Sequence, residues 1–263
     1  MANTEPPLKV RPRIWVGLLI WLAYLALVIT IQAASGIPYD AWGESAGNLF
    51  FGAGVSLIVA TVLLVITTTL LGWWRPALFE RERSRHRWPI FVPILTAIAA
   101  IMNLTATDWS AYGGAFLAAS LALLLVGFTE ELVSRGLLLT ALRSRLREVW
   151  VWLITSVLFG LSHLVNILLG APDSGTVIQV TSAFLAGTVF YILRRVTGSL
   201  IWAMVLHGLW DFSVFATAVG QAGDLAAIAN VVELTAGFLG LACVAFVIRG
   251  ANERTDAPVA PRA

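Results

Sequence analysis

The sequence predicts an all-α membrane protein, a polytopic bundle of about eight transmembrane helices with both termini in the cytoplasm. Hydrophobic residues make up 59% of the 263 residues and charged residues only 12%, about half the charged fraction of an ordinary soluble domain. The apolar residues fall into runs of membrane-spanning length, and the basic residues fall into alternate connections between them. These observations exclude a soluble globular domain and indicate a multi-pass protein.

Eight apolar runs are long enough to cross a bilayer as helices, which takes about 17–25 residues. They occupy residues 14–34, 46–74, 89–107, 111–140, 149–169, 176–193, 198–219 and 225–248. The second and fourth exceed the required length, so we expect them to tilt or to extend into water. The first is longer than the apolar core of a signal peptide, and "IQAAS" is a poor cleavage site, so we expect a retained helix.

The basic residues predict the orientation of these spans. They precede the first span, lie in alternate connections and follow the last span: Lys9, Arg11, Arg13, Arg75, Arg81, Arg83, Arg85, Arg87, Arg143, Arg145, Arg147, Arg194, Arg195, Arg249, Arg254 and Arg262. The other connections contain Asp40, Glu44, Asp108, Asp173 and Asp224 but no Lys or Arg. The positive-inside rule therefore places both termini in the cytoplasm. This explains the basic loop "RERSRHR" without nucleic-acid binding, which we do not expect.

Seven ionisable residues lie inside the predicted spans, where hydrocarbon would otherwise surround them: Glu130, Glu131, Arg135, His163, His207, Asp211 and Glu233. A charge at the bilayer centre costs about 2.5–3.5 kcal/mol on insertion scales. Such residues usually face the bundle interior or a wet cavity and pair with one another. We therefore expect a functional site here, except at Glu233, which matches no motif and to which we assign no catalytic role. The single cysteine, Cys243, is expected to be a buried thiol.

Helical spacing arranges these residues in pairs. Glu131 and Arg135 are four residues apart and can form an ion pair on one helix face, whereas Glu130 points about 100° away from Glu131. His207 and Asp211 share a face of the seventh span in the same way. The two glutamates are therefore expected to have different tasks.

The fifth span repeats this spacing with Phe159 and His163, and Asn166 falls near the same face. We expect Asn166 to be an interhelical hydrogen-bond partner. Small residues flank the ionisable positions and would let the helices pack closely around a site: Gly127, Gly136, Gly160, Ser162 and Gly208.

These residue types suit two kinds of hydrolytic chemistry. A buried Glu130 could act as general base toward water, with a histidine holding the water or moving a proton. His207 and Asp211 could stabilise an oxyanion. The same side chains could instead bind zinc, although the common helical zinc signature H-E-x-x-H is missing from the sequence.

Three motifs in order resemble those of a known family. "EELVSR" matches EExxxR, "FGLSH" matches FxxxH and "HGLWD" matches HxxxN/D. The chain thereby resembles, over roughly residues 110–220, the CPBP family of intramembrane proteases, also called the Abi or CAAX-protease-like family. That family includes type II CAAX prenyl endopeptidases and bacterial proteins linked to bacteriocin self-immunity.

The resemblance implies an α-helical protease whose site lies within the bilayer. Glu130 would activate the attacking water with help from His163, His207 and Asp211 would form the oxyanion-binding pair, and Glu131 and Arg135 would shape the site. This chain has Asp211 where many members have asparagine, and an ionised aspartate cannot donate a hydrogen bond. Asp211 would therefore be protonated, orient His207 or bind a cation.

The resemblance also divides the chain. We expect a cytoplasmic tail at 1–13, three membrane helices at 14–107, a CAAX-protease-like catalytic core at 108–220, a last membrane helix at 221–250 and a cytoplasmic tail at 251–263. The bilayer and a membrane-associated protein or peptide substrate are the expected partners, and the plasma membrane of a bacterium is the expected location.

Several alternatives stay open at this stage. The site residues Glu130, His163, His207 and Asp211 are also the candidate metal ligands, and zinc is the candidate cofactor; we slightly favour a metal-free glutamate mechanism. A proton-coupled transporter could use the same buried groups as a relay. A non-catalytic scaffold or immunity protein of the same fold is the third function considered. The oligomeric state cannot be predicted.

Overall fold

The computed structural model describes residues 8–220, 223–251 and 253–254. Over these ranges the chain forms helices and no β-strand, and eight of the helical spans are long and apolar enough to cross a membrane. The predicted all-α polytopic fold is therefore confirmed. The two predicted tails lie largely outside the described residues, and the cytoplasmic placement of both ends stays a prediction.

The eight spans agree with the predicted runs, and four of them are built from more than one helical segment. They are α1 (Ile14–Ala34); α2, η2 and α3 (Ala46–Leu49, Phe50–Gly54, Val55–Leu71); η3 and α5 (Trp88–Ile90, Phe91–Ala106); α6, η5, α7, η6 and α8 (Gly114–Ser120, Leu121–Leu123, Leu124–Glu131, Leu132–Leu138, Leu139–Leu142); α9 and α10 (Glu148–Ser162, Val165–Leu168); α11 (Asp173–Thr197); α12 (Ile201–Val219); and α13 (Asp224–Ile248). Short elements between spans are η1 (Tyr39–Gly43), α4 (Trp74–Leu78) and η4 (Trp109–Ala111).

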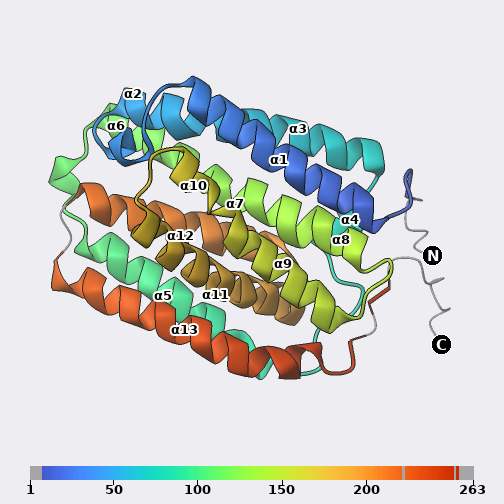
Figure 1. Ribbon diagram of the computed structural model, residues 1–263. Helices are drawn as coiled ribbons and strands as arrows, with labels where there is room; N and C mark the ends of the chain where they lie inside the picture. Colours follow the sequence, from blue (N-terminus) through green and yellow to red (C-terminus); the bar gives the residue numbers. More distant parts are fainter. Residues whose placement is uncertain (1–7, 221–222, 252, 255–263) are drawn as a thin grey trace.

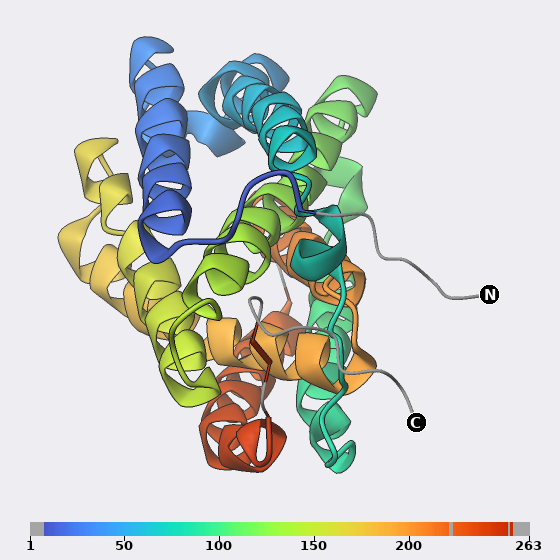
Figure 2. The ribbon, with the colours of Figure 1, turned by 90° about the vertical axis from the view of Figure 1, so that its right-hand side faces the viewer.

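The spans form a bundle in which α7 and its continuation η6 lie in the middle. α12 packs against α7 and α5, while α11 packs against both α9 and α13. Viewed from one end (Figure 2), α1 and α3 lie at one edge of the bundle and α5 and α13 at the opposite edge. α1 begins at the same end of the bundle at which α13 ends (Figure 1), as an even number of spans requires.

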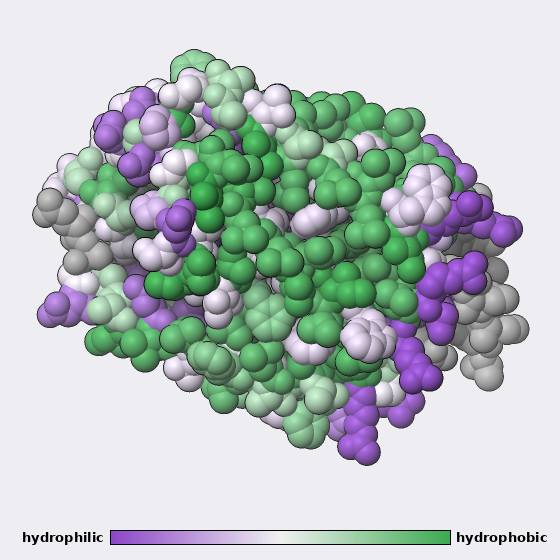
Figure 3. All heavy atoms as spheres, in the orientation of Figure 1, coloured by the Kyte–Doolittle hydropathy of each residue, from purple (hydrophilic) through white to green (hydrophobic). Residues whose placement is uncertain are grey.

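The surface has the polarity expected of a protein in a bilayer. Hydrophobic side chains cover the middle of the face shown in Figure 3, and hydrophilic ones gather at the ends. Large apolar residues such as Leu70, Leu168 and Phe238 are exposed. A lipid environment would satisfy these residues, whereas water would not.

The sixth span departs from the prediction at its end. The apolar run ends at residue 193, but α11 continues to Thr197, and Arg194 and Arg195 are buried in the bundle. The prediction that both arginines lie in a loop after the span is therefore wrong. Both guanidiniums pair with the carboxylate of Glu80, which offsets the cost of burying them.

Candidate active site

The residues singled out from the sequence come from three spans that meet inside the bundle. Glu130 and Glu131 end α7, and Arg135 follows in η6, a π-helical segment. His207 and Asp211 lie on α12, and His163 caps the C-terminal end of α9. π-Helical segments are rare and often occur at functional sites. Here the wider turn begins directly after the two glutamates.

Two glycines bring α7 and α12 into close contact. A Cβ atom added at Gly127 would lie 2.1 Å from the carbonyl oxygen of Met204, and one at Gly208 would lie 2.7 Å from that of Leu124. The two helix backbones can approach this closely only because neither residue has a side chain. The close helix packing predicted from Gly127 and Gly208 is therefore confirmed. The contact holds His207 against the end of α7.

Glu131 is the buried centre of the group. Its Oε1 accepts a hydrogen bond from Arg135 Nη1 at 2.8 Å, with both side chains completely buried, as the spacing predicted. The same oxygen lies 3.2 Å from His207 Nδ1. The Arg135 guanidinium lies 3.9 Å from the ring centre of Phe159, a favourable cation–π distance. A Cβ atom added at Gly187 on α11 would lie 2.1 Å from Arg135 Nη2, so this glycine gives the guanidinium its space.

His207 connects the buried and the accessible halves of the group. Its Nε2 lies 3.5 Å from Asp211 Oδ2 and 3.9 Å from Glu130 Oε2. Its ring stacks on Phe190 at 4.7 Å, which limits ring rotation. The side chains of Asp211 and Glu130 are 35% and 24% exposed, in contrast to Glu131. One histidine thus contacts three carboxylates, two of which are accessible from outside.

His163 joins this group through an aromatic ring. Its Nδ1 lies 3.0 Å from the carbonyl oxygen of Phe159, so Nε2 is the nitrogen left for other partners. The Phe159 ring meets the rings of both His163 and His207 edge-on, at 5.3 and 5.6 Å. The amide of Asn166 donates to Gln179 on α11 at 2.9 Å, which confirms the predicted interhelical hydrogen bond.

The described residues do not form a metal site in this arrangement. They contain no group of three or more His, Cys, Asp or Glu side chains placed to hold a metal ion. Of the two His207 nitrogens, Nδ1 lies at hydrogen-bonding distance from Glu131 Oε1, which leaves Nε2 for a metal. Because the candidate ligands do not converge in a group of three as placed, no step below uses a metal.

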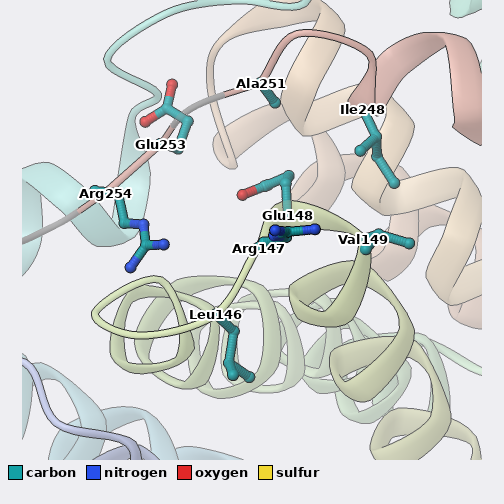
Figure 4. Close-up of a pocket in the computed structure, with 8 residues that line it drawn as sticks. All are labelled: Leu146, Arg147, Glu148, Val149, Ile248, Ala251, Glu253 and Arg254. Carbon is teal, nitrogen blue, oxygen red and sulfur yellow. The ribbon is translucent and has the colours of Figure 1, made fainter.

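Other features lie apart from this group. A pocket of about 370 Å³ opens where α9 begins and α13 ends (Figure 4), and its lining consists of Leu146, Arg147, Glu148, Val149, Ile248, Ala251, Glu253 and Arg254. None of the candidate site residues lines it.

Glu233 on α13 has a buried Oε2 that accepts no hydrogen bond from the described residues. Cys243 is a buried free thiol, as predicted.

Sequence reasoning missed the contributions of α11. Phe190 stacks on the His207 ring, and Gly187 leaves space for the Arg135 guanidinium. Both residues lie in a span without a recognised motif. Their only local signal is a glycine within an apolar helix, which can mark close packing. That signal alone does not indicate which side chain occupies the space.

Comparison with known proteins agrees with the motifs. The sequence model of the family described as type II CAAX prenyl endopeptidase Rce1-like matches residues 112–213, which include every candidate site residue. None of the curated proteins compared with the chain matches it. At the level of the family, the match supports a membrane-embedded endopeptidase that acts on a membrane-associated substrate. The resemblance drawn from EExxxR, FxxxH and HxxxN/D is thus confirmed over residues 112–213, where the chain is similar to the Rce1-like, CAAX-protease-like family of intramembrane proteases.

Proposed function

We propose that the protein is an intramembrane endopeptidase that hydrolyses a peptide bond in a membrane-associated protein or peptide. The contact of His207 with both Glu130 and Asp211, on the accessible side of the site, carries this proposal. Under this proposal, Glu130 is a base that lies beside His207, an oxyanion donor, inside an apolar bundle. Both are needed to hydrolyse an amide without a covalent intermediate.

In the proposed first step, Glu130 removes a proton from a water molecule, and the water oxygen attacks the carbonyl carbon of the substrate. The Glu130 side chain is 24% exposed although its Oε2 atom is buried, so the carboxylate can receive a hydrogen bond from water on its exposed side. With a proton on Nδ1 bonded to the Phe159 carbonyl, His163 would present its Nε2 lone pair to the same water.

In the same step, negative charge develops on the carbonyl oxygen of the substrate. A His207 ring with hydrogen on both nitrogens would donate from Nδ1 to Glu131 and from Nε2 to this oxyanion. Before the oxyanion forms, an ionised Asp211 would accept the hydrogen bond from Nε2 and hold the ring in place, and the oxyanion would then take over this hydrogen bond. The tetrahedral intermediate then collapses as the C–N bond breaks, and Glu130 returns its proton to the leaving amine.

Glu131 and Arg135 would support this chemistry without contacting the substrate. Both are completely buried, and Glu131 contacts His207 directly. Loss of either would leave an uncompensated charge in the bundle. The alternative role of this ion pair, a purely structural lock, predicts lost stability without a selective loss of turnover.

The experiment compares the membrane proteomes of cells that produce the wild-type protein and the Glu130→Gln variant. The substitution keeps the size of the side chain and removes the base, so we expect one or more peptide products to disappear while the protein level stays constant. Purified protein in liposomes should then cleave the identified substrate. Solute flux without a product would favour the transporter, and full biological activity of Glu130→Gln would favour the scaffold.

A further inference from the structure

We propose that Glu80 is a positioning residue for the candidate active site, acting through Arg194 on the π-helical segment that carries Arg135. The inference deepens the proposed function and rests on it. Glu80 lies between the second and third spans, outside the segment matched by the family. No pattern in the sequence connects Glu80 with the motifs.

Glu80 is the central acceptor of a buried ion cluster formed by Glu80, Arg143, Glu148, Arg194, Arg195 and Glu253. Arg143 donates to both of its oxygens at 3.0 and 2.9 Å, and Arg194 and Arg195 each donate to one of them. Burial alone would raise the pKa of the Glu80 carboxyl, but the three guanidiniums, Arg143 foremost, hold this pKa well below its ordinary value. Glu80 is therefore a fixed negative charge.

The backbone around Glu80 is fixed to the turn between α11 and α12. The Glu80 N–H donates to the carbonyl of Gly198 at 3.0 Å, and the Ser84 N–H donates to that of Arg195 at 2.8 Å. On the other side, the Leu200 N–H donates to the carbonyl of Leu78 at 2.8 Å. The carboxylate thus stands on a segment that is held on both sides, which a positioning residue requires.

Arg194 carries the connection from Glu80 to the site. While its Nε donates to Glu80, its Nη1 donates to the carbonyl of Arg135 and to that of Ala77 at 2.6 Å, and its Nη2 donates to that of Pro76 at 2.9 Å. One planar guanidinium therefore joins Glu80, α4 and η6. A lysine could not hold all these acceptors, because its single ammonium lacks the fork geometry.

The carbonyl that Arg194 holds belongs to the residue that pairs with Glu131. Arg135 thus has its backbone held by Arg194 and its guanidinium bonded to Glu131, which contacts His207. If Glu80 releases Arg194, η6 loses this anchor and the Arg135–Glu131–His207 geometry relaxes. When a substitution far from the reacting atoms displaces a catalytic group by about 1 Å, turnover can fall about 100-fold.

The test compares Glu80→Gln with Glu148→Gln, a matched control from the same cluster. Both carboxylates are buried and both pair with Arg143, but Glu148 bonds the hydroxyl of Tyr191 and none of its hydrogen bonds reaches Arg194 or Arg135. We expect Glu80→Gln to reduce kcat about tenfold or more with KM within about twofold, and Glu148→Gln to leave kcat within about twofold. Glu80→Asp, which keeps the charge, should recover part of the lost kcat.

A second readout needs no substrate. The chain has only three histidines, so ¹⁵N-histidine labelling gives a simple NMR spectrum in which the His207→Gln variant assigns the His207 signals. We expect the Nδ1 resonance of His207 to shift in Glu80→Gln and in Arg194→Lys but not in Glu148→Gln, while His163 serves as the internal reference. Arg194→Lys also tests the link if Glu80→Gln does not fold.

The outcomes separate this inference from the proposed function. Equal effects of Glu80→Gln and Glu148→Gln on kcat and on the His207 resonance would show that the cluster is only structural, and would overturn the inference. A wild-type protein that cleaves nothing would overturn the proposed function, and the NMR comparison would still decide whether Glu80 positions His207.

Discussion

The close contact between α7 and α12 predicts that Gly127→Ala disrupts the candidate site. The new Cβ atom would lie 2.1 Å from the carbonyl oxygen of Met204, 2.4 Å from the nitrogen of Gly208 and 2.9 Å from its Cα. All three are backbone atoms, so no side chain can rotate away. To bring the shortest contact to 3.0 Å, the helices must separate by about 0.9 Å.

This separation acts directly on the bond between His207 Nδ1 and Glu131 Oε1, which is 3.2 Å long in the native bundle. Lengthened by about 0.9 Å, it would exceed the range of a hydrogen bond. We expect a stability loss of about 1–3 kcal/mol from overpacking and a loss of turnover of about 100-fold from misplaced groups. The assays are thermal unfolding in detergent and cleavage in liposomes.

Gly114→Ala is the matched control, because it adds the same methyl group to the same span and meets no atom within 4 Å. We expect it to leave stability and activity close to wild type. If Gly127→Ala behaves like Gly114→Ala in both assays, the packing of α7 against α12 does not set the site geometry, and the reasoning is refuted.

Three further predictions concern the topology, the metal and the ion cluster. Reporter fusions in the loops at Asp40, Asp108, Asp173 and Asp224 should all report outside, because every other connection is basic; two cytoplasmic signals would contradict this topology. Activity should survive strong chelation, since the described residues form no group of three or more side chains placed to hold a metal ion; stoichiometric zinc, with activity lost on its removal and restored on its return, would contradict the metal-free mechanism. Glu80, whose pKa is lowered from 4.5, stabilises the fold above pH 4.5, and this contribution is lost as pH falls toward its folded pKa. Acid unfolding should therefore be steeper in wild type than in Glu80→Gln, and identical pH profiles would argue against an ionised Glu80.

The sequence predicts features that depend on neighbouring residues along one helix. The eight spans follow from local apolar length, and the Glu131–Arg135 ion pair follows from a spacing of four residues. The resemblance to the family, drawn from EExxxR, FxxxH and HxxxN/D, also rests on motifs within single spans. In each case, the information lies within one or two turns of helix.

Contacts between distant segments could not be predicted in the same way. Arg194 resembles a topogenic loop residue, because an arginine after an apolar run usually marks a membrane boundary. Its burial depends on Glu80, 114 residues away, and no periodicity within either segment indicates this partner. The π-helical turn of η6 likewise has no sequence signature that separates it from an α-helix.

The helix that contains η6 connects the candidate active site with the buried ion cluster around Glu80. The number of residues between these two sites is therefore important. From Glu131 to Leu142 the chain is continuously helical through η6 and α8, and Arg143 caps this helix, so each residue in it sets an angle as well as a length. Deletion of one residue from α8 would rotate everything beyond it by about 100° and shift it by about 1.5 Å. Arg143 would then point away from Glu80 while Glu131 still faced His207. The number of residues between Glu131 and Arg143 therefore determines whether one helix can place Glu131 at His207 and Arg143 at Glu80.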